Sequence, residues 1–417
     1  MLNRVIEVRA VAERLRRRRF TSCSFAHDPS LVLIALFAAA VIKSGAAAAE
    51  PRPPGQFCAA SEGCARAAEE PKTEAAAASA RKWHPGHYMQ VLRGSVDSQQ
   101  AARFPYYDAI GNNPDIEGVS VWFRWSQLEP RRGDYAAGIQ LIRAELDKLK
   151  SLPVPKRLVI QVLDAAYGSD CPASDYFPSY LSSNGSLFQT MNQCVWRRWD
   201  ATTMGYFIDL MAALGDAFDG DPYVEMISPF HETAIGWNKT PFPSDFSDAA
   251  LETQYRRLAD AMSGAWPTTI VRFPTNWGMN ESIMSDFVSH LESLGAGAGN
   301  PDICPSCDMA IDSILSGDIG GRDYRGVIPI VMGVEVSELG YDSVGPDGGF
   351  TVQEIYDYAH DAKRSTHILW DRNVVIGNSS SDPRYGQQWP AMLNLFSTQP
   401  IEHTDCPRSF ADGCRTD

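Results

Sequence analysis

The sequence predicts an α/β fold, a single (β/α)8 TIM barrel preceded by an N-terminal signal peptide and a flexible linker. From Trp83 onward, short apolar runs alternate with amphipathic helical stretches, which is the pattern of βα units around a parallel sheet. Eight such apolar runs can be found. Residues 83–400 are also long enough for one barrel of this kind, which needs about 250 residues.

The N-terminus has the layout of an export signal over residues 1–49. A basic stretch from Arg14 to Phe20 precedes an apolar run from Leu31 to Ile42, and small residues follow up to Ala49. The apolar run is too short for a bilayer span, which needs about 20 residues. We therefore expect a cleaved signal and no stable membrane span after cleavage, with an uncleaved anchor as the alternative. Residues 50–82 are rich in Ala, Glu and Pro and are interpreted as a low-complexity linker.

The predicted strands are short apolar runs that each end close to a polar residue or a turn. The sixth is the least distinct, a short run that enters a Gly-rich loop. In chain order the eight are His87 to Gly94, Gly118 to Trp125, Arg157 to Asp164, Tyr223 to Glu232, Thr269 to Trp277, Ser293 to Asp302, Gly326 to Glu335 and Thr366 to Asp371.

Helices are predicted between these strands wherever apolar residues recur every three or four positions. The clearest examples are Tyr135 to Leu152, Thr202 to Phe218 and Val352 to Lys363. An open doubly wound sheet is the alternative, but it would need a Gly-rich phosphate turn after its first strand, and Arg93-Gly94-Ser95 is not one. We assign the barrel domain to residues 83–400 and a C-terminal tail to 401–417.

Cysteine usage favours an oxidising compartment. Of nine cysteines, Cys23 lies in the predicted signal, and the other eight form four neighbouring pairs along the chain. An even number of cysteines outside the cytosol predicts disulfides, although spacing alone leaves their connectivity open. A metal site at Cys304 and Cys307 is the competing reading. No second Cys or His pair stands at zinc spacing, so we expect a secreted or periplasmic protein with disulfide bonds.

Charge limits the kinds of partner. The whole chain has a net charge of −14, and residues 1–49 hold eight of its basic and three of its acidic residues. The remainder therefore has 29 basic and 48 acidic residues, a net charge of −19. Such a surface repels nucleic acid and anionic membranes, whereas a neutral oligo- or polysaccharide is easy to accommodate.

The candidate catalytic residues are Glu232 and Glu335. Active sites of these barrels lie at the carboxyl ends of the strands, and each Glu follows an apolar strand there. The fourth and seventh strands lie across the barrel from each other, so two carboxylates could flank one scissile bond. Glu338 is a rival to Glu335. For Glu232 alone, a strand-end salt bridge is the plainer interpretation, and the pattern of the surrounding residues favours catalysis.

The candidate substrate-binding residues combine aromatic rings, which stack on sugars, with polar groups that bond hydroxyls. Arg124 could orient the nucleophile or form a buried ion pair, and His231 could bond substrate or be structural. Together the set consists of Arg124, Trp125, His231, Trp237, Asn276, Trp277 and Trp370. We expect no cofactor and no metal. A metal-dependent site built from His84, His87, Asp164 and Asp371 is a less favoured hypothesis.

Several segments resemble the clan A glycoside hydrolases, which are (β/α)8 retaining enzymes. VWFRWSQLEPRRGDY is similar to the W-S-x-L-E-P-x-x-G-x-Y segment of family 42 β-galactosidases. ISPFHETAIGW resembles the strand of family 26 β-mannanases that carries the acid/base, which implies this role for Glu232, with His231 where most of the clan has Asn. PIVMGVE resembles the nucleophile strand and implies Glu335, while VSELG keeps Glu338 as an alternative. The Trp370 of HILWD matches a Trp common at the end of the eighth strand.

The resemblance covers roughly residues 84–390 in patches from different families. It implies a secreted glycoside hydrolase that cleaves β-glycosidic bonds by double displacement, with Glu335 as nucleophile and Glu232 as acid/base. A non-catalytic carbohydrate-binding barrel is the alternative hypothesis. The sugar, its linkage, exo or endo action and the oligomeric state are left open by the sequence.

Overall fold

The computed structural model describes residues 80–91, 107, 110–190, 193–235, 242–276, 280–306, 309–334, 350–371 and 389–416. Within them, eight parallel strands form one sheet in the order β10-β9-β8-β4-β3-β2-β12-β11. The strands are β2 (Gly86–Val91), β3 (Ile116–Arg124), β4 (Arg157–Leu163), β8 (Val224–Ser228), β9 (Ile270–Pro274), β10 (Gly297–Gly299), β11 (Val331–Val334) and β12 (His367–Asp371). Each falls within or overlaps one of the eight predicted runs.

The sheet curls into a nearly closed barrel, because its two end strands also meet. Ala298 of β10 bridges to Ile330 next to β11, and the amide of Gly333 donates to the carbonyl of Asn300 at 2.8 Å. A Cβ on Gly299 would lie 1.8 Å from the Val331 carbonyl oxygen, and one on Gly333 would lie 2.1 Å from that of Pro301. Glycine is therefore required for this close approach, which explains why the sixth strand is Gly-rich.

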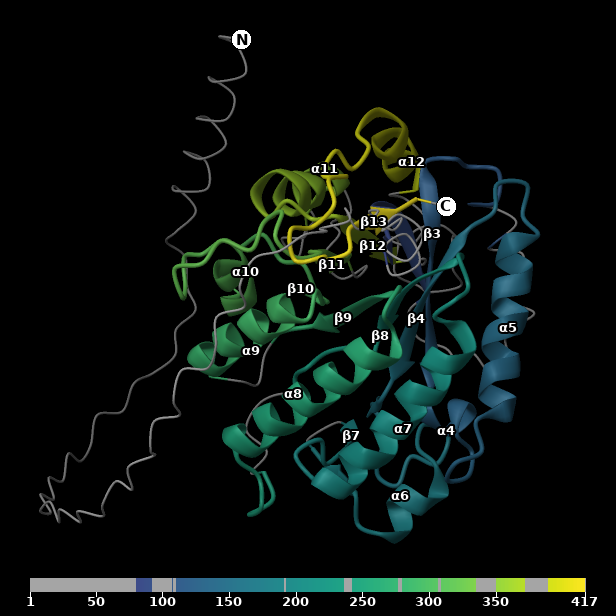
Figure 1. The fold of residues 1–417 in the computed structure, drawn as a ribbon, viewed down its shortest axis with the longest axis vertical. Coiled ribbons are helices and arrows are strands. Elements are labelled where there is room, and N and C mark those ends of the chain that lie inside the picture. The colour runs from purple at the N-terminus through teal and green to yellow at the C-terminus, as the bar shows by residue number, and fades with distance from the viewer. Residues whose placement is uncertain are drawn as a thin grey trace, which may run out of the picture. The chain divides into compact units, whose positions relative to one another are not determined.

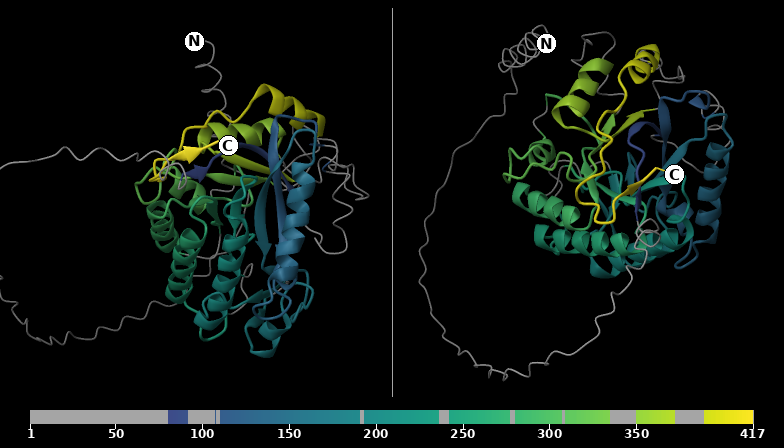
Figure 2. Two further views of the ribbon diagram at one scale, coloured as in Figure 1. Left: turned by 45° about the vertical axis from the view of Figure 1, so that its right-hand side comes forward. Right: turned by 45° about the horizontal axis from the view of Figure 1, so that its top comes forward.

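Helices cover the outer face of the barrel (Figures 1 and 2). The longer helices bury an apolar stripe, as Phe207, Leu210 and Leu214 of α7 do. The helices are α4 (Trp125–Leu128), α5 (Ala136–Lys150), α6 (Ser179–Ser183), α7 (Ala201–Phe218), α8 (Asp248–Ala265), α9 (Glu281–Ser293), α10 (Ala310–Leu315), α11 (Val352–Tyr356), the π-helix η2 (Asp357–Ala362) and α12 (Trp389–Thr398). Side chains cap several of their N-termini, for example Asp200 of α7 and Ser247 of α8.

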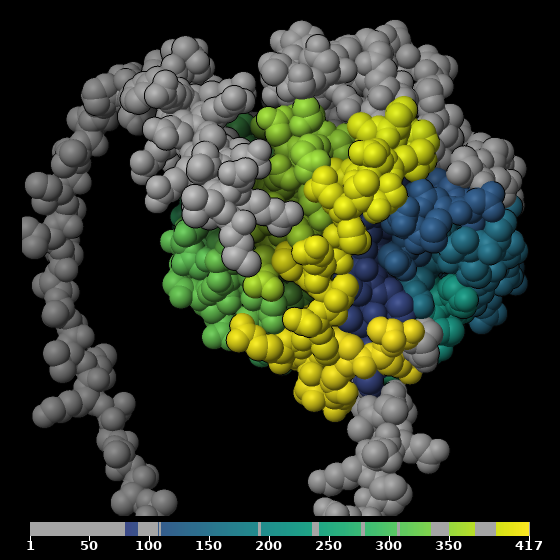
Figure 3. Space-filling view, turned by 90° about the horizontal axis from the view of Figure 1, so that it is seen from above, coloured from purple at the N-terminus to yellow at the C-terminus, as the bar shows by residue number. Residues whose placement is uncertain are grey.

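The amino-terminal end of the barrel is closed by the two ends of the described chain. Strand β1 (Arg81–Lys82) pairs in parallel with β13 (Cys414–Arg415), and Trp83 packs edge-on against Phe410 at 5.7 Å. In Figure 3 the C-terminal segment, in yellow, runs beside the N-terminal strands, in purple. The folded part of the chain therefore extends past the predicted boundaries at 83 and 400, and it includes most of the predicted tail.

A second, three-stranded antiparallel sheet leaves the barrel after β4. It is composed of β5 (Ala165–Tyr167), β6 (Leu187–Gln189) and β7 (Gln193–Trp196) in the order β5-β7-β6. We call residues 165–196, with this sheet and α6, the side arm. A disulfide between Cys171 and Cys194 joins the loop after β5 to β7. No pattern in the sequence analysis predicted this arm.

The disulfides support the cysteine interpretation. Cys171 pairs with Cys194 and Cys406 with Cys414, as expected for neighbours along the chain. Cys304 is also disulfide-bonded, so its sulfur is not available as a metal thiolate. The predicted signal peptide lies outside the described residues, and so do Cys58, Cys64 and Cys307. No helix in the described part of the chain is both long and apolar enough to cross a bilayer.

Candidate active site

Glu232 lies at the carboxyl end of the barrel, four residues after the last residue of β8. Its side chain is almost fully enclosed, with 3% of the residue exposed. The phenol of Tyr167 donates to Oε1 at 2.5 Å, and the amide of Asn276 donates to Oε2 at 2.7 Å. Both carboxyl oxygens are thus held by neutral donors from neighbouring segments, which fixes the orientation of the carboxyl group.

Burial raises the pKa of Glu232 above its ordinary value. The hydrogen bonds from Tyr167 and Asn276 and the charge of Arg198 act in the opposite direction, and the carboxylate of Asp164 adds to the rise. The pKa remains raised on balance, because the donors that touch the carboxyl are uncharged and the nearby guanidinium is already paired. A carboxyl group in this environment is suited to act as a general acid near neutral pH.

An ion pair beneath Glu232 holds its backbone in place. Asp164 and Arg198 are both fully buried and lie 2.7 Å apart. The other guanidinium nitrogen of Arg198 donates to the backbone oxygen of Glu232 at 2.8 Å and to the Tyr255 hydroxyl at 3.1 Å. The indole of Trp196 donates to the same Asp164 oxygen at 2.8 Å. The segment after β8 is therefore fixed at its main chain as well as at its carboxyl group.

One wall beside Glu232 is made of aromatic and basic side chains. His231 lies 4.3 Å from the ring of Trp122, and its Nδ1 is 3.0 Å from the Tyr167 hydroxyl. Arg124, at the end of β3, stacks over Tyr176 at 4.3 Å. The indole N–H of Trp122 is buried and has no hydrogen-bond partner within the part of the chain that the structure describes. A ligand hydroxyl could accept this hydrogen.

Three of the predicted substrate-binding residues come together around Glu232, in two different ways. His231 and Arg124 belong to the aromatic wall. Asn276 is 1% exposed and holds the Glu232 carboxyl directly, while its carbonyl oxygen accepts from the Ala234 amide at 3.0 Å. In this arrangement both polar ends of the Asn276 side chain are used within the protein, one of them to hold the Glu232 carboxyl.

Trp125 and Trp370 do not fit the predicted substrate-binding role, because both rings are fully buried. Trp125 begins α4, packs edge-on against Trp196 at 5.2 Å and donates to Glu129 at 2.9 Å. Trp370 points outward from β12, lies 5.6 Å from the ring of Phe396 of α12 in a tilted contact, and donates to His87 at 3.1 Å. These indoles have their polar and apolar contacts inside the protein, so we correct their assignment to core residues.

The remaining predicted site residues lie outside the described residues. They are Glu335, Glu338, Trp237 and Trp277. Strand β11 ends at Val334, directly before Glu335, and β11 is three strands from β8 in the ring of eight. Their roles stay predictions.

The four residues of the metal hypothesis contact different partners and do not face one common site. His84 bonds Glu225 at 2.6 Å at the amino-terminal end of the barrel, and the Nε2 of His87 lies 3.1 Å from the Gln399 carbonyl oxygen. Asp164 is paired with Arg198, and Asp371 is buried at the end of β12. The described residues contain no group of three or more His, Cys, Asp or Glu arranged to hold a metal ion.

Sequence reasoning missed four residues of this site: Trp122, Tyr167, Tyr176 and Arg198. Trp122 shares the inward-facing side of β3 with Arg124, two residues later, so the period-two alternation of a strand could have found it. Tyr167, Tyr176 and Arg198 come from the side arm or its junction with α7, and no periodic signal marks them.

Comparisons with known proteins place the fold. No family model and no curated protein matches the chain. Among solved structures it is similar to the catalytic domain of β-amylase from Paenibacillus polymyxa, with a TM-score of 0.53 at 9% identity over 78% of this chain and 100% of that one. GH5_18 from Streptomyces cattleya gives 0.48 at 11% identity over 76% and 82%, and β-mannanase from the blue mussel Mytilus edulis gives 0.46 at 12% identity over 77% and 94%.

The fold and the first of these comparisons define the class: the chain is an α/β protein with a (β/α)8 barrel, the fold that it shares with this β-amylase domain. The neighbours are themselves glycoside hydrolases. Nothing at the family level supports the more specific resemblance to families 42 and 26. Since one barrel fold hosts many chemistries, the activity has to be argued from the site.

Proposed function

We propose that this protein is a secreted glycoside hydrolase that cleaves β-glycosidic bonds with Glu232 as its general acid/base. The observation that carries the proposal is the environment of Glu232: a buried carboxyl at the carboxyl end of a barrel strand, held by two neutral donors, with its pKa raised by burial. A raised pKa makes such a group a better proton donor, as a general acid that protonates a leaving-group oxygen must be.

The second carboxylate in the proposal is Glu335, with Glu338 as the alternative. In a retaining reaction this carboxylate attacks the anomeric carbon while Glu232 protonates the departing oxygen, so that a covalent glycosyl-enzyme forms and the aglycone leaves as an alcohol. Glu232, now ionised, takes a proton from water, whose oxygen replaces the carboxylate at the anomeric carbon. The position of Glu335 directly after β11 supports this role.

The wall of Trp122, His231, Tyr176 and Arg124 supports a carbohydrate as substrate. Aromatic rings accept the apolar face of a sugar, and the buried indole N–H of Trp122 offers a hydrogen bond to a hydroxyl. The acidic chain favours a neutral glycan. The disulfides Cys171–Cys194 and Cys406–Cys414 support an extracellular or periplasmic location.

The test is hydrolysis of a panel of β-linked polysaccharides and aryl β-glycosides by the wild type and by Glu232→Ala, Glu335→Ala and Glu338→Ala. Glu232→Ala should lose on the order of 10²–10⁴-fold in turnover of glycans and much less on aryl glycosides with good leaving groups, which need no acid. Added azide should restore turnover of the nucleophile variant and give a glycosyl azide of inverted configuration. NMR of the first wild-type product reports whether configuration is retained.

Full glycan hydrolysis by Glu232→Ala would contradict the proposal. Wild-type protein that binds glycans but cleaves none would instead favour a non-catalytic carbohydrate-binding barrel. In that case, Trp122→Ala should weaken binding while Glu232→Ala leaves it unchanged. The catalytic and binding hypotheses are therefore separated by the same set of proteins.

A further inference from the structure

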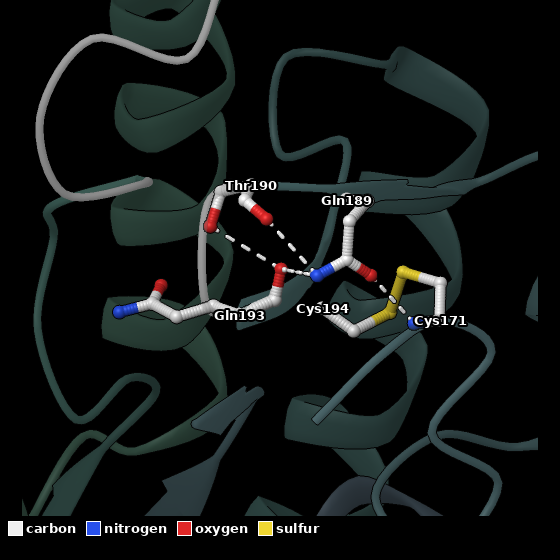
Figure 4. The surroundings of a disulfide bond; sticks show 5 residues. All are labelled: Cys171, Gln189, Thr190, Gln193 and Cys194. Atoms are coloured by element: carbon white, nitrogen blue, oxygen red, sulfur yellow. Dashed lines mark hydrogen bonds between the residues drawn. A yellow bond between two sulfur atoms is a disulfide. The ribbon is translucent and has the colours of Figure 1, made fainter. Parts of the chain in front are cut away.

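The side arm delivers one residue to the candidate acid. Tyr167 is the last residue of β5, and β5 pairs with β7 so that Tyr167 lies opposite Gln193 and Ala166 opposite Cys194. The Cys171–Cys194 disulfide fastens the loop that begins directly after Tyr167. Figure 4 shows Gln189 beside this disulfide, where its side-chain oxygen accepts from the Cys171 amide at 2.7 Å and its nitrogen donates to the carbonyls of Thr190 and Gln193.

We propose that Tyr167 is a positioning residue that, together with His231, sets the protonation state of Glu232, and that the disulfide-fastened side arm holds it in that place. This inference rests on the proposed function of Glu232. It assigns a role in the reaction to an element outside the eight βα units of the barrel.

A count of hydrogens leads to the proposal. Tyr167 has one hydroxyl hydrogen but contacts two groups, Glu232 Oε1 at 2.5 Å and His231 Nδ1 at 3.0 Å. When Glu232 is ionised, the phenol donates to Oε1 and accepts a hydrogen from Nδ1 of His231. When Oε1 carries a proton, both hydrogen bonds reverse: Oε1–H donates to the phenol oxygen, which donates to Nδ1 of a neutral imidazole with its hydrogen on Nε2. Tyr167, His231 and Glu232 therefore remain hydrogen-bonded to one another whether Glu232 is protonated or ionised.

The other groups around Glu232 lack this property. The amide nitrogen of Asn276 can only donate, so it serves Oε2 in either state. Arg198 bonds the backbone oxygen of Glu232 and is paired with Asp164, and the Tyr255 hydroxyl donates to the Thr233 carbonyl at 2.7 Å. Burial and the nearby Glu232 carboxylate raise the pKa of Tyr167 well above its ordinary value, so its hydroxyl hydrogen is retained at working pH. Tyr167 is thus the contact that can change direction with the charge of the acid.

The experiment measures kcat/KM against pH for the wild type and Tyr167→Phe. The hydrogen bond that the phenol donates to the carboxylate is charge-assisted and stronger than the neutral one it accepts from the protonated carboxyl, so its removal disfavours the carboxylate. The falling, high-pH limb should therefore move upward by about one pH unit. Turnover at neutral pH should drop on the order of tenfold, because the ionised form is needed in the second step. The matched control is Tyr107→Phe, which removes a 2.9 Å hydrogen bond to the buried Glu145 of α5, outside the side arm, and should leave the profile unchanged.

A second pair of variants tests the side arm. Cys171→Ser/Cys194→Ser frees the loop after Tyr167 and should shift the same limb in the same direction. Cys406→Ser/Cys414→Ser removes a disulfide at the other end of the barrel and should lower only the melting temperature. Identical limbs in Tyr167→Phe and wild type, or equal shifts in the two disulfide variants, would overturn the inference.

A direct readout separates failure of this inference from failure of the proposed function. Carboxyl ¹³C NMR follows the titration of Glu232 in the wild type and in Tyr167→Phe without any substrate. If no glycan is cleaved by the wild type but the Glu232 titration moves upward in Tyr167→Phe, the reaction is wrong and the positioning role stands. If glycans are cleaved and this titration does not move, the positioning role is wrong.

Discussion

Two glutamates of the same chain segment, Glu225 and Glu232, are both buried, yet their pKa values are shifted in opposite directions. Glu225 lies in β8 toward the amino-terminal end of the barrel. It accepts from the backbone amide of His84 at 2.8 Å, and its oxygens lie 2.6 Å from His84 Nδ1 and 3.5 Å from His367 Nε2. Burial acts to raise the pKa of Glu225, but its contacts with His367 and His84 outweigh burial and hold the pKa well below its usual range.

Glu232 has the same burial but only uncharged donors on its carboxyl group, and its pKa is raised. The comparison shows that burial alone does not decide the charge of a carboxyl group. Partners that can themselves become positive stabilise the carboxylate at Glu225, whereas Tyr167 and Asn276 do not compensate fully for lost hydration at Glu232. The first site links β8 to the amino-terminal end of the barrel, and the second is the environment that favours the protonated form of a carboxyl group.

The largest effect on stability is expected at Glu225. Glu225→Gln removes the charge that its two histidines face and should lower the free energy of unfolding by about 2–4 kcal/mol near neutral pH. Because the folded pKa is lowered, the ionised form contributes stability that is fully present above the unfolded value of about 4.3 and is lost as the pH falls toward the folded pKa. Urea unfolding at several pH values should therefore show a difference between wild type and variant that shrinks in acid.

The control for this variant is Glu292→Gln, which removes a carboxylate from a surface pair with Arg322. Its effect should stay below about 1 kcal/mol. Equal losses in Glu225→Gln and Glu292→Gln would show that the Glu225 cluster contributes no more than a surface ion pair.

A smaller effect of opposite sign is expected at Glu232. Glu232→Gln should raise the free energy of unfolding at neutral pH by about 0.5–2 kcal/mol while activity is lost, since it removes a carboxylate that is poorly solvated in the fold. With a raised folded pKa, the ionised group costs stability above the unfolded value, and the cost is complete above the folded pKa. The gain from the substitution should thus grow with rising pH. A variant less stable than wild type at pH 8 would contradict the raised pKa.

The barrel could be predicted from the sequence because the strands lie in short apolar runs. Even β10, the least distinct strand, is marked by the glycines that its contact with β11 requires. Glu232 could be found from its place after a strand. The strand-end rule failed for Trp370, because side chains alternate along β12: His367 faces the barrel interior, where it meets Glu225, while Trp370 faces α12. Trp125 was misassigned because it begins a helix rather than ending a strand.

Tyr167 could not be predicted for a different reason. Its contact with Glu232 depends on the path of the side arm, which is set by pairing between β5 and β7 and by the Cys171–Cys194 disulfide. These are contacts between residues far apart in the chain, and no local periodicity encodes which ring reaches the barrel mouth. The sequence therefore indicated Glu232 as a candidate acid but gave no sign of Tyr167, which contacts its carboxyl group at 2.5 Å.

The most direct test of the central claim is a carboxyl ¹³C NMR titration of the wild-type protein, with Glu225→Gln and Glu232→Gln used to assign the two resonances. Our account predicts that Glu232 titrates above the ordinary glutamate value and that Glu225 remains ionised to well below it. Titration of Glu232 at or below the ordinary value would contradict its role as a general acid.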